Sequence, residues 1–457
     1  MKTEAMYATM KPWRLFFKVA IPGMISMLAM SIYTIVEGIF LGQTLGEGAF
    51  AAVNIALPMV MINFSVADLI GVGASAPISI ALGKNDHDAA NNIFTCSVLL
   101  IFLASTVLGA ILFFAAEALG RMVGAEGVLL DTATRYLRVS ALCSPLASIF
   151  FAMDNYLRIS GYVKTSMAIN VISNLLTIGM LAFFLLVCKM DVVGSALAVS
   201  LSMCASSAVA MIPFIRKKAL LQFVKPKFSV SMLRRIAACG SPSFLSNISG
   251  RIVSVLMNIS LMRLGVKALG ENGGTTAVAV YAILMYASDF CWPMLYGISD
   301  SLSPAIGYNW GAQNFGRVKK IAACGFIGTA VVGLVSSTAL FSFPGVVAAL
   351  FAKGEDFRLL QMSTHAIRLF CLAYVFRWLV VMTQSFLSAL EKPLQAATVS
   401  VGTALVFPVI LLGALWNLGL NGIWLNFAGV NMIAAILCVV FLIFLYKEIK
   451  AKQEAQR

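Results

Sequence analysis

The side chains of this sequence that could do chemistry are charged residues placed inside long apolar runs. Three of them are carboxylates, Glu37, Asp68 and Asp289, and two are guanidinium groups, Arg251 and Arg377. A charged group surrounded by hydrocarbon is costly unless it is paired, so residues in this position are candidates for a functional role. We therefore expect this set to bind ions or solutes.

An enzyme is not expected, because the motifs of the common catalytic sites are missing from the sequence. It has no G-x-x-x-x-G-K-[ST] stretch for a nucleotide, no H-E-x-x-H for zinc and no G-x-S-x-G for a serine nucleophile. It has only two His residues, and its nine Cys residues stand singly without a C-x-x-C pair. We predict no catalytic residue, no metal site and no cofactor.

The elements that position the charged residues are predicted to be membrane-spanning helices. Of the 457 residues, 60% are hydrophobic and only 11% are charged, whereas soluble domains carry about 25% charged residues. Apolar runs of about 20 residues cross a bilayer as helices and are too long for barrel strands. The predicted fold class is an all-α polytopic membrane protein. Its twelve expected spans are residues 15–41, 50–82, 91–118, 131–157, 162–187, 192–214, 234–263, 276–308, 318–344, 359–389, 394–416 and 420–446.

The positive charge of the chain indicates its orientation in the membrane. With a cytoplasmic N-terminus, 22 of the 33 Lys and Arg residues fall on one side of the predicted spans. Because cytoplasmic segments are enriched in Lys and Arg, we predict that both termini are cytoplasmic and that the protein lies in the cell membrane. Contact with anionic lipid head groups then explains the net charge of +14, and no nucleic-acid partner is expected.

The chain is predicted to be an internal duplication. Aligning Gly83 with Gly311 sets "GKNDHDAANNI" against "GAQNFGRVKKI", and Pro22 similarly corresponds to Pro242. An offset of about 220–228 residues relates two halves of six spans each. We expect two pseudo-symmetric lobes around a central cavity, with an N-terminal lobe at residues 1–215, a basic cytoplasmic linker at 216–233 and a C-terminal lobe at 234–457.

Four stretches of the sequence resemble those of the multidrug and toxic compound extrusion (MATE) family, in its bacterial and archaeal forms. They are "IYTIVEGIFLGQTLGEGAFAAV", "YLRISGYVKTSMAINVISNLL", "AIGYNWGAQNFGRVKK" and "LGLNGIW", which occur in both halves in the expected order. The resemblance implies a monomeric exporter of small cationic or amphiphilic molecules. It also implies that inward flow of protons or sodium ions drives export.

The resemblance also assigns roles to individual residues. The acid of the first span falls at Glu37 and the asparagine of the fifth span at Asn174, which together form the implied ion-coupling site. The carboxylate usually found one turn later falls at Ile178, and the hydroxyl of the sixth span falls at Val199, with Ser200 beside it. Because few oxygen ligands remain for a sodium ion, coupling to H+ is favoured over Na+.

Other candidate cavity residues come from their position within the spans. Tyr33, one turn before Glu37, is the expected substrate contact. Asn174 either orients Glu37, contacts the substrate or bridges two helices.

The remaining charged candidates have two open interpretations. Asp68 and Asp289 either attract cationic cargo in the cavity or are neutralised by Arg251 or Arg377. Asp154 and Arg158, four residues apart near the end of a span, are expected to form a local ion pair.

An alternative function is a flippase for lipid-linked precursors on a related two-lobe fold. Arg251 and Arg377 favour it, because such a site needs cations to hold pyrophosphate. The acidic set Glu37, Asp68 and Asp289 favours cationic cargo instead.

Overall fold

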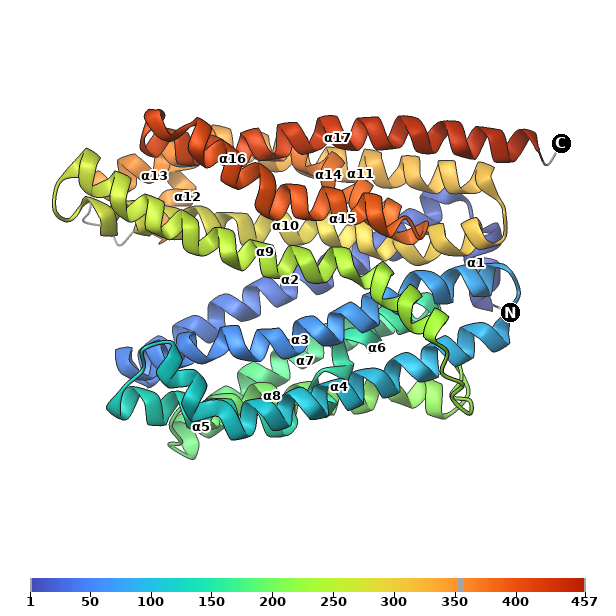
Figure 1. Ribbon diagram of the computed structural model, residues 1–457, viewed down its shortest axis with the longest axis horizontal. Helices are drawn as coiled ribbons and strands as arrows, with labels where there is room; N and C mark the ends of the chain where they lie inside the picture. Colours follow the sequence, from blue (N-terminus) through green and yellow to red (C-terminus); the bar gives the residue numbers. More distant parts are fainter. Residues whose placement is uncertain (1, 352–356, 456–457) are drawn as a thin grey trace. The chain divides into compact units, whose positions relative to one another are not determined.

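The computed structural model describes residues 2–351 and 357–455, which are helical almost throughout (Figure 1). Eleven helices in the described residues are long and apolar enough to cross a membrane. A further span is formed by α13 (Phe357–Phe370) and α14 (Ala373–Ala389), which are bent by 49° at their junction. The predicted all-α polytopic fold with twelve spans is therefore confirmed.

The helices of the first half follow one another with short connections. They are α1 (Lys2–Thr9), α2 (Pro12–Thr44), α3 (Gly46–Gly83), α4 (His87–Met122), α5 (Gly127–Ala147), α6 (Ile149–Ile159), α7 (Val163–Ala182), the π-helical turn η1 (Phe183–Val187) and α8 (Val192–Ile215). The helix pair α5 and α6 forms a single span that is interrupted at Ser148.

The second half repeats this order. It contains α9 (Val230–Leu269), α10 (Gly273–Gly311), α11 (Phe315–Ser342), α12 (Pro344–Phe351), α13, α14, α15 (Pro393–Val401), the π-helical turn η2 (Gly402–Val406), α16 (Phe407–Ala414), the 3₁₀ turn η3 (Trp416–Leu418) and α17 (Leu420–Glu454). In both halves the fourth span is broken, and the fifth contains a π-helical turn.

The backbone at the duplicated polar turn shows the repeat most clearly. Asn85 and Gln313, which are 228 residues apart, have positive φ angles of 60° and 56°. The next residue caps the following helix in each half: the Asp86 carboxylate accepts a hydrogen bond from the Ala89 amide, and the Asn314 side chain accepts one from the Arg317 amide. The internal duplication inferred from the sequence is thus present in the fold.

The chain divides into two compact units, with one limit between α1 and α2 and the other two inside α2 and α9. The first unit comprises Met1–Met10 and Ile25–Gly240, and the second comprises Lys11–Met24 and Ser241–Arg457. This division gives residues 11–24 to the second unit and 216–240 to the first. It therefore differs from the predicted lobe limits, which follow the basic loop at 216–233.

Close backbone packing at two glycines explains this division. In the second unit, a Cβ atom on Gly23 would lie 1.9 Å from Ser301 Oγ, so the start of α2 packs directly on α10. In the first unit, a Cβ atom on Gly240 would lie 1.9 Å from the Leu69 carbonyl oxygen, so the start of α9 packs directly on α3. Any larger residue at either position would force the two helices apart.

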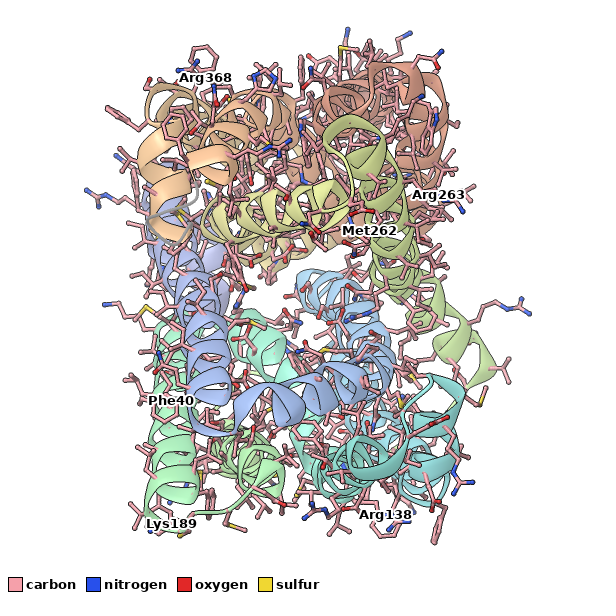
Figure 2. The ribbon with its side chains drawn as sticks, turned by 90° about the vertical axis from the view of Figure 1, so that its left-hand side faces the viewer. Phe40, Arg138, Lys189, Met262, Arg263 and Arg368 are labelled. Carbon is pink, nitrogen blue, oxygen red and sulfur yellow. The ribbon has the colours of Figure 1, made fainter. Side chains whose placement is uncertain are left out.

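Each unit carries exposed cations on its outside. Figure 2, which looks along the helices, shows Arg138 and Lys189 at the periphery of the first unit, and Arg263 and Arg368 at that of the second. The Arg138 guanidinium carbon lies 5.9 Å from the centre of the Phe113 ring. Such residues suit a helix end at a membrane surface, where an apolar stem can be buried and the charge remains solvated.

Candidate ion-coupling and substrate site

The first candidate site is a carboxyl group on α2 of the first unit. The Tyr33 hydroxyl lies within interaction range of the Glu37 carboxylate, one turn further along the helix. Tyr136 of α5 is almost fully buried and lies close enough to interact with Glu37 electrostatically. Among the described residues, no Lys, Arg or His forms an ion pair with Glu37. The carboxyl therefore has a neutral hydroxyl nearby and no counter-charge.

An apolar cluster borders this carboxyl. It includes Leu41, one turn after Glu37, and Tyr136 itself. Its other buried members come from α3, α4, α5, α7, η1 and α8: Val53, Ala56, Met59, Val60, Ala116, Leu137, Leu181, Leu185, Val192, Ala196 and Ala198. Because hydrocarbon does not solvate charge, only an arriving proton or other cation can neutralise Glu37 there.

The other predicted coupling residue, Asn174, lies on α7 and is half-buried. Within the described part of the chain it makes no side-chain hydrogen bond, neither to Glu37 nor to another helix. One turn further along, Ile178 is a half-buried apolar residue, and on α8 Ser200 is buried. The structure thus brings Tyr33 and Glu37 together but leaves Asn174 unconnected to them.

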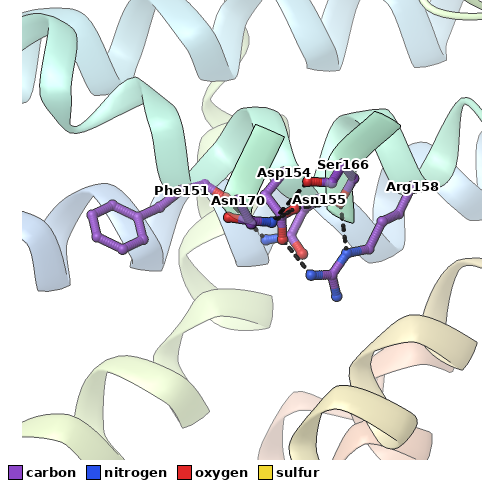
Figure 3. Close-up of polar contacts among 6 residues, drawn as sticks. All are labelled: Phe151, Asp154, Asn155, Arg158, Ser166 and Asn170. Carbon is purple, nitrogen blue, oxygen red and sulfur yellow. Dashed lines mark hydrogen bonds and ion pairs between the residues drawn. The ribbon is translucent and has the colours of Figure 1, made fainter. Parts of the chain in front are cut away.

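A polar network joins α6 and α7 in the same unit (Figure 3). The predicted local ion pair is confirmed, because Arg158 Nη2 lies 2.5 Å from Asp154 Oδ2. Ser166 and Asn170 of α7 also donate hydrogen bonds to Asp154 Oδ1, the latter at 2.6 Å. Arg158 is only 2% exposed, and its carbonyl oxygen accepts a bond from the Tyr7 hydroxyl of α1. This network is internally satisfied and fixes helices rather than forming a site.

Three further predicted cavity residues lie on other helices. Asp68 is half-buried on α3 of the first unit, whereas Arg251 on α9 and Asp289 on α10 of the second unit are exposed. Among the described residues, Asp289 forms no ion pair with Arg251 or Arg377. The interpretation in which an arginine neutralises Asp289 is therefore not supported.

The second candidate site surrounds Arg377 on α14. Its guanidinium carbon lies 4.3 Å from the centre of the Trp292 ring of α10. Its Nη1 atom donates to Asn431 Oδ1 of α17 at 3.3 Å. An aromatic face and an amide oxygen both stabilise a cation without neutralising it, so the charge of Arg377 persists at this position.

Sequence patterns alone did not identify the residues that complete both sites. Tyr136 lies about 100 residues from Glu37 in the sequence, and Trp292 and Asn431 lie on helices far from Arg377. The only signal for Trp292 is its place in "YASDFCWPM", three residues after Asp289. Among the residues that the structure describes, no group of three or more His, Cys, Asp and Glu residues could hold a metal ion.

Comparison with known proteins relates both halves of the chain to transporters. The MatE family model matches residues 22–183 and 242–412. The chain is 24% identical over 437 residues to the multidrug export protein MepA of Staphylococcus aureus (strain MSSA476), covering 92% of this chain and 93% of that protein. A multidrug export protein MepA of Staphylococcus saprophyticus is 24% identical over 353 residues, with 76% and 75% covered.

Solved structures show the same fold. An outward-facing multidrug resistance MATE family transporter superposes with a TM-score of 0.89 at 23% identity, with 99% of each chain covered. A MATE structure in the straight conformation gives a TM-score of 0.87 at 24% identity, again with 99% of each chain covered. Since the family model matches most of the sequence in two copies, this chain is a multi-pass membrane protein that belongs to the MatE family of transporters.

Proposed function

We propose that this protein is a secondary active multidrug exporter that exchanges organic cations and other amphiphiles for protons. The observation that carries the proposal is the Glu37 carboxyl, which has the Tyr33 hydroxyl nearby and no counter-charge beside an apolar cluster. A carboxyl in this setting can bind either a proton or a cationic ligand, so the two compete. The names of the staphylococcal relatives support export of several drugs.

Protons are favoured over sodium ions because the region offers few oxygen ligands. Hard cations are held by several carboxylate, carbonyl or hydroxyl oxygens. Here Ile178 and Val199 occupy two positions at which the family resemblance implies such ligands. A single carboxyl suffices for a proton.

The transport cycle that we propose uses the duplicated architecture. A proton from outside binds Glu37, cargo enters from the cytoplasm and releases the proton, and the two halves rock to expose the cargo outside. In this proposal the protein works as a monomer in the cytoplasmic membrane, in contact with lipid and with both termini in the cytoplasm.

Transport of a fluorescent organic cation by reconstituted vesicles tests this proposal. We would impose a proton gradient and a sodium gradient separately, in wild type and in Glu37→Gln. Glu117→Gln is the matched control, because Glu117 is exposed and pairs with Arg121 at 2.6 Å. We expect transport to follow the proton gradient and to vanish only in Glu37→Gln. Normal transport in Glu37→Gln would refute the assignment. A response to the sodium gradient alone would identify sodium, rather than the proton, as the coupling ion.

The flippase remains the second candidate, favoured by the unneutralised Arg377. It predicts no response to either ion gradient with organic cations. Transbilayer movement of a fluorescent isoprenoid pyrophosphate in the same vesicles would distinguish it from the exporter.

A further inference from the structure

The Arg377 cluster of the second unit is built from three helices that lie far apart in the sequence. Arg377 is near the middle of the span formed by α13 and α14, Trp292 is at the middle of α10, and Asn431 lies in α17. The Asn431 Nδ2 atom donates to the Phe427 carbonyl at 2.8 Å, which turns the amide oxygen toward Arg377. The position of the guanidinium is therefore fixed from two sides.

A hydrogen bond between α10 and α14 holds this arrangement. The hydroxyl groups of Tyr374 and Ser288 are 3.0 Å apart, and both residues are buried. Tyr374 precedes Arg377 by one turn, and Ser288 precedes Trp292 by one turn. The stacking of Arg377 on Trp292 thus rests on a rigid contact rather than on two mobile side chains.

The guanidinium nevertheless has unused binding capacity. It carries five N–H donors, of which Nη1 meets Asn431, while the Trp292 ring covers one face of the group. No carboxylate among the described residues pairs with Arg377. A cation within a membrane span is usually balanced by an anionic group, and Arg377 has none within ion-pair distance among the described residues.

We propose that Arg377 is a specificity-determining residue that binds the carboxylate of amphiphilic cargo. The planar fork of Arg matches the two oxygens of a carboxylate. Trp292 is 38% exposed and offers an aromatic surface to the body of the same molecule. Asp289 lies one turn away on α10 and is exposed, so a cationic group on the cargo would meet an acid there. This inference rests on the proposed export function and assigns a cargo group to the second unit.

Binding of tetramethylrhodamine and its methyl ester tests the inference, since the two dyes differ only in the carboxylate. Affinities would be measured by fluorescence anisotropy with the full-length protein in phosphatidylcholine nanodiscs. We expect Arg377→Gln to lower the ratio of carboxylate to ester affinity about tenfold. Arg377→Lys, which keeps the charge but loses the fork, should lower it about threefold.

Arg121→Gln is the matched control, because Arg121 is exposed and lies in the first unit. It should leave the ratio unchanged. An unchanged ratio in Arg377→Gln, or an equal loss for both dyes, would overturn the inference and assign Arg377 a structural role. If Arg377→Gln does not fold, an unchanged ratio in Arg377→Lys would overturn it as well. Failure of the export proposal would appear separately, as the absence of gradient-driven transport of either dye by the wild type.

Discussion

Glu37 of the first unit and Arg377 of the second are both charged side chains within a span that have no ion-pair partner among the described residues, and their charges differ in sign. In the first unit, Glu37 has a tyrosine hydroxyl nearby and an apolar border. In the second, Arg377 rests on Trp292 and Asn431. An acid that a proton can neutralise suits coupling, whereas a guanidinium stays charged and suits recognition. The two halves of the duplicated fold therefore share their helices but differ in the charged residues that their spans hold.

Removal of the acid should have the largest effect. We expect Glu37→Gln to reduce proton-driven transport to the level of empty vesicles, because the amide cannot exchange a proton. Arg377→Gln should keep a response to the proton gradient with a cationic dye. If both variants lose that response equally, the two sites do not have separate roles.

Removal of the aromatic support should have a smaller effect. Trp292→Ala takes away the ring under Arg377, so we expect the carboxylate-to-ester affinity ratio to fall about fivefold. Trp292→Phe keeps an aromatic face and should retain most of the preference. Equal ratios in the Ala variant and the wild type would show that the stacking does not position Arg377.

Loss of the hydroxyl beside the acid should have a weaker effect still. Tyr33→Phe removes only the hydroxyl that lies near Glu37, and we expect transport to slow about threefold while it remains coupled to protons. Initial rates in vesicles under a fixed proton gradient would measure this. Complete loss of coupling would mean that Tyr33, rather than Glu37 alone, carries the proton.

The duplicated polar turns allow a comparison of stabilising contacts at positions outside the two candidate sites. In the first unit, Asn92 exchanges two hydrogen bonds with the backbone of Lys227, at 2.8 and 2.9 Å, and so holds the basic loop. In the second, Lys319 donates to Gln453 at 2.8 Å and lies 4.5 Å from the centre of the Tyr446 ring of α17. The same turn therefore secures a different segment in each half.

Removal of these contacts should have the smallest effect on transport. Asn92→Ala should lower the free energy of unfolding by about 1–3 kcal/mol, and Lys319→Ala by about 1 kcal/mol, with transport rates within about twofold of the wild type. Thermal unfolding in detergent would measure the difference. A loss of transport at unchanged stability would give the turns a direct functional role.

The fold could be predicted from the sequence because the length and apolar composition of membrane spans identify them. The equivalence of Gly83 with Gly311 also indicated the duplication, which the matching turn backbones confirm. The assignment of residues 11–24 to the second unit and 234–240 to the first was not predicted, because it depends on close packing at Gly23 and Gly240. Such contacts are set by the three-dimensional approach of helices distant in the sequence.

The candidate sites could be predicted only in part, for a related reason. Charged residues in apolar runs identified Glu37 and Arg377. Of their partners, Tyr136, Trp292 and Asn431 were not visible, because helices that are apolar on every side give no periodic signal for the face that turns inward. Trp292 reads as an ordinary apolar residue until α10 and α14 are seen to pack together.

Proton release on cargo binding tests most directly the claim that Glu37 exchanges a proton for cargo. The pH of a weakly buffered solution of the purified protein would be followed as a cationic dye is added, across a series of starting pH values. We predict release of about one proton per dye bound by wild type and by Glu117→Gln, and none by Glu37→Gln. Equal proton release by Glu37→Gln and wild type would contradict the account.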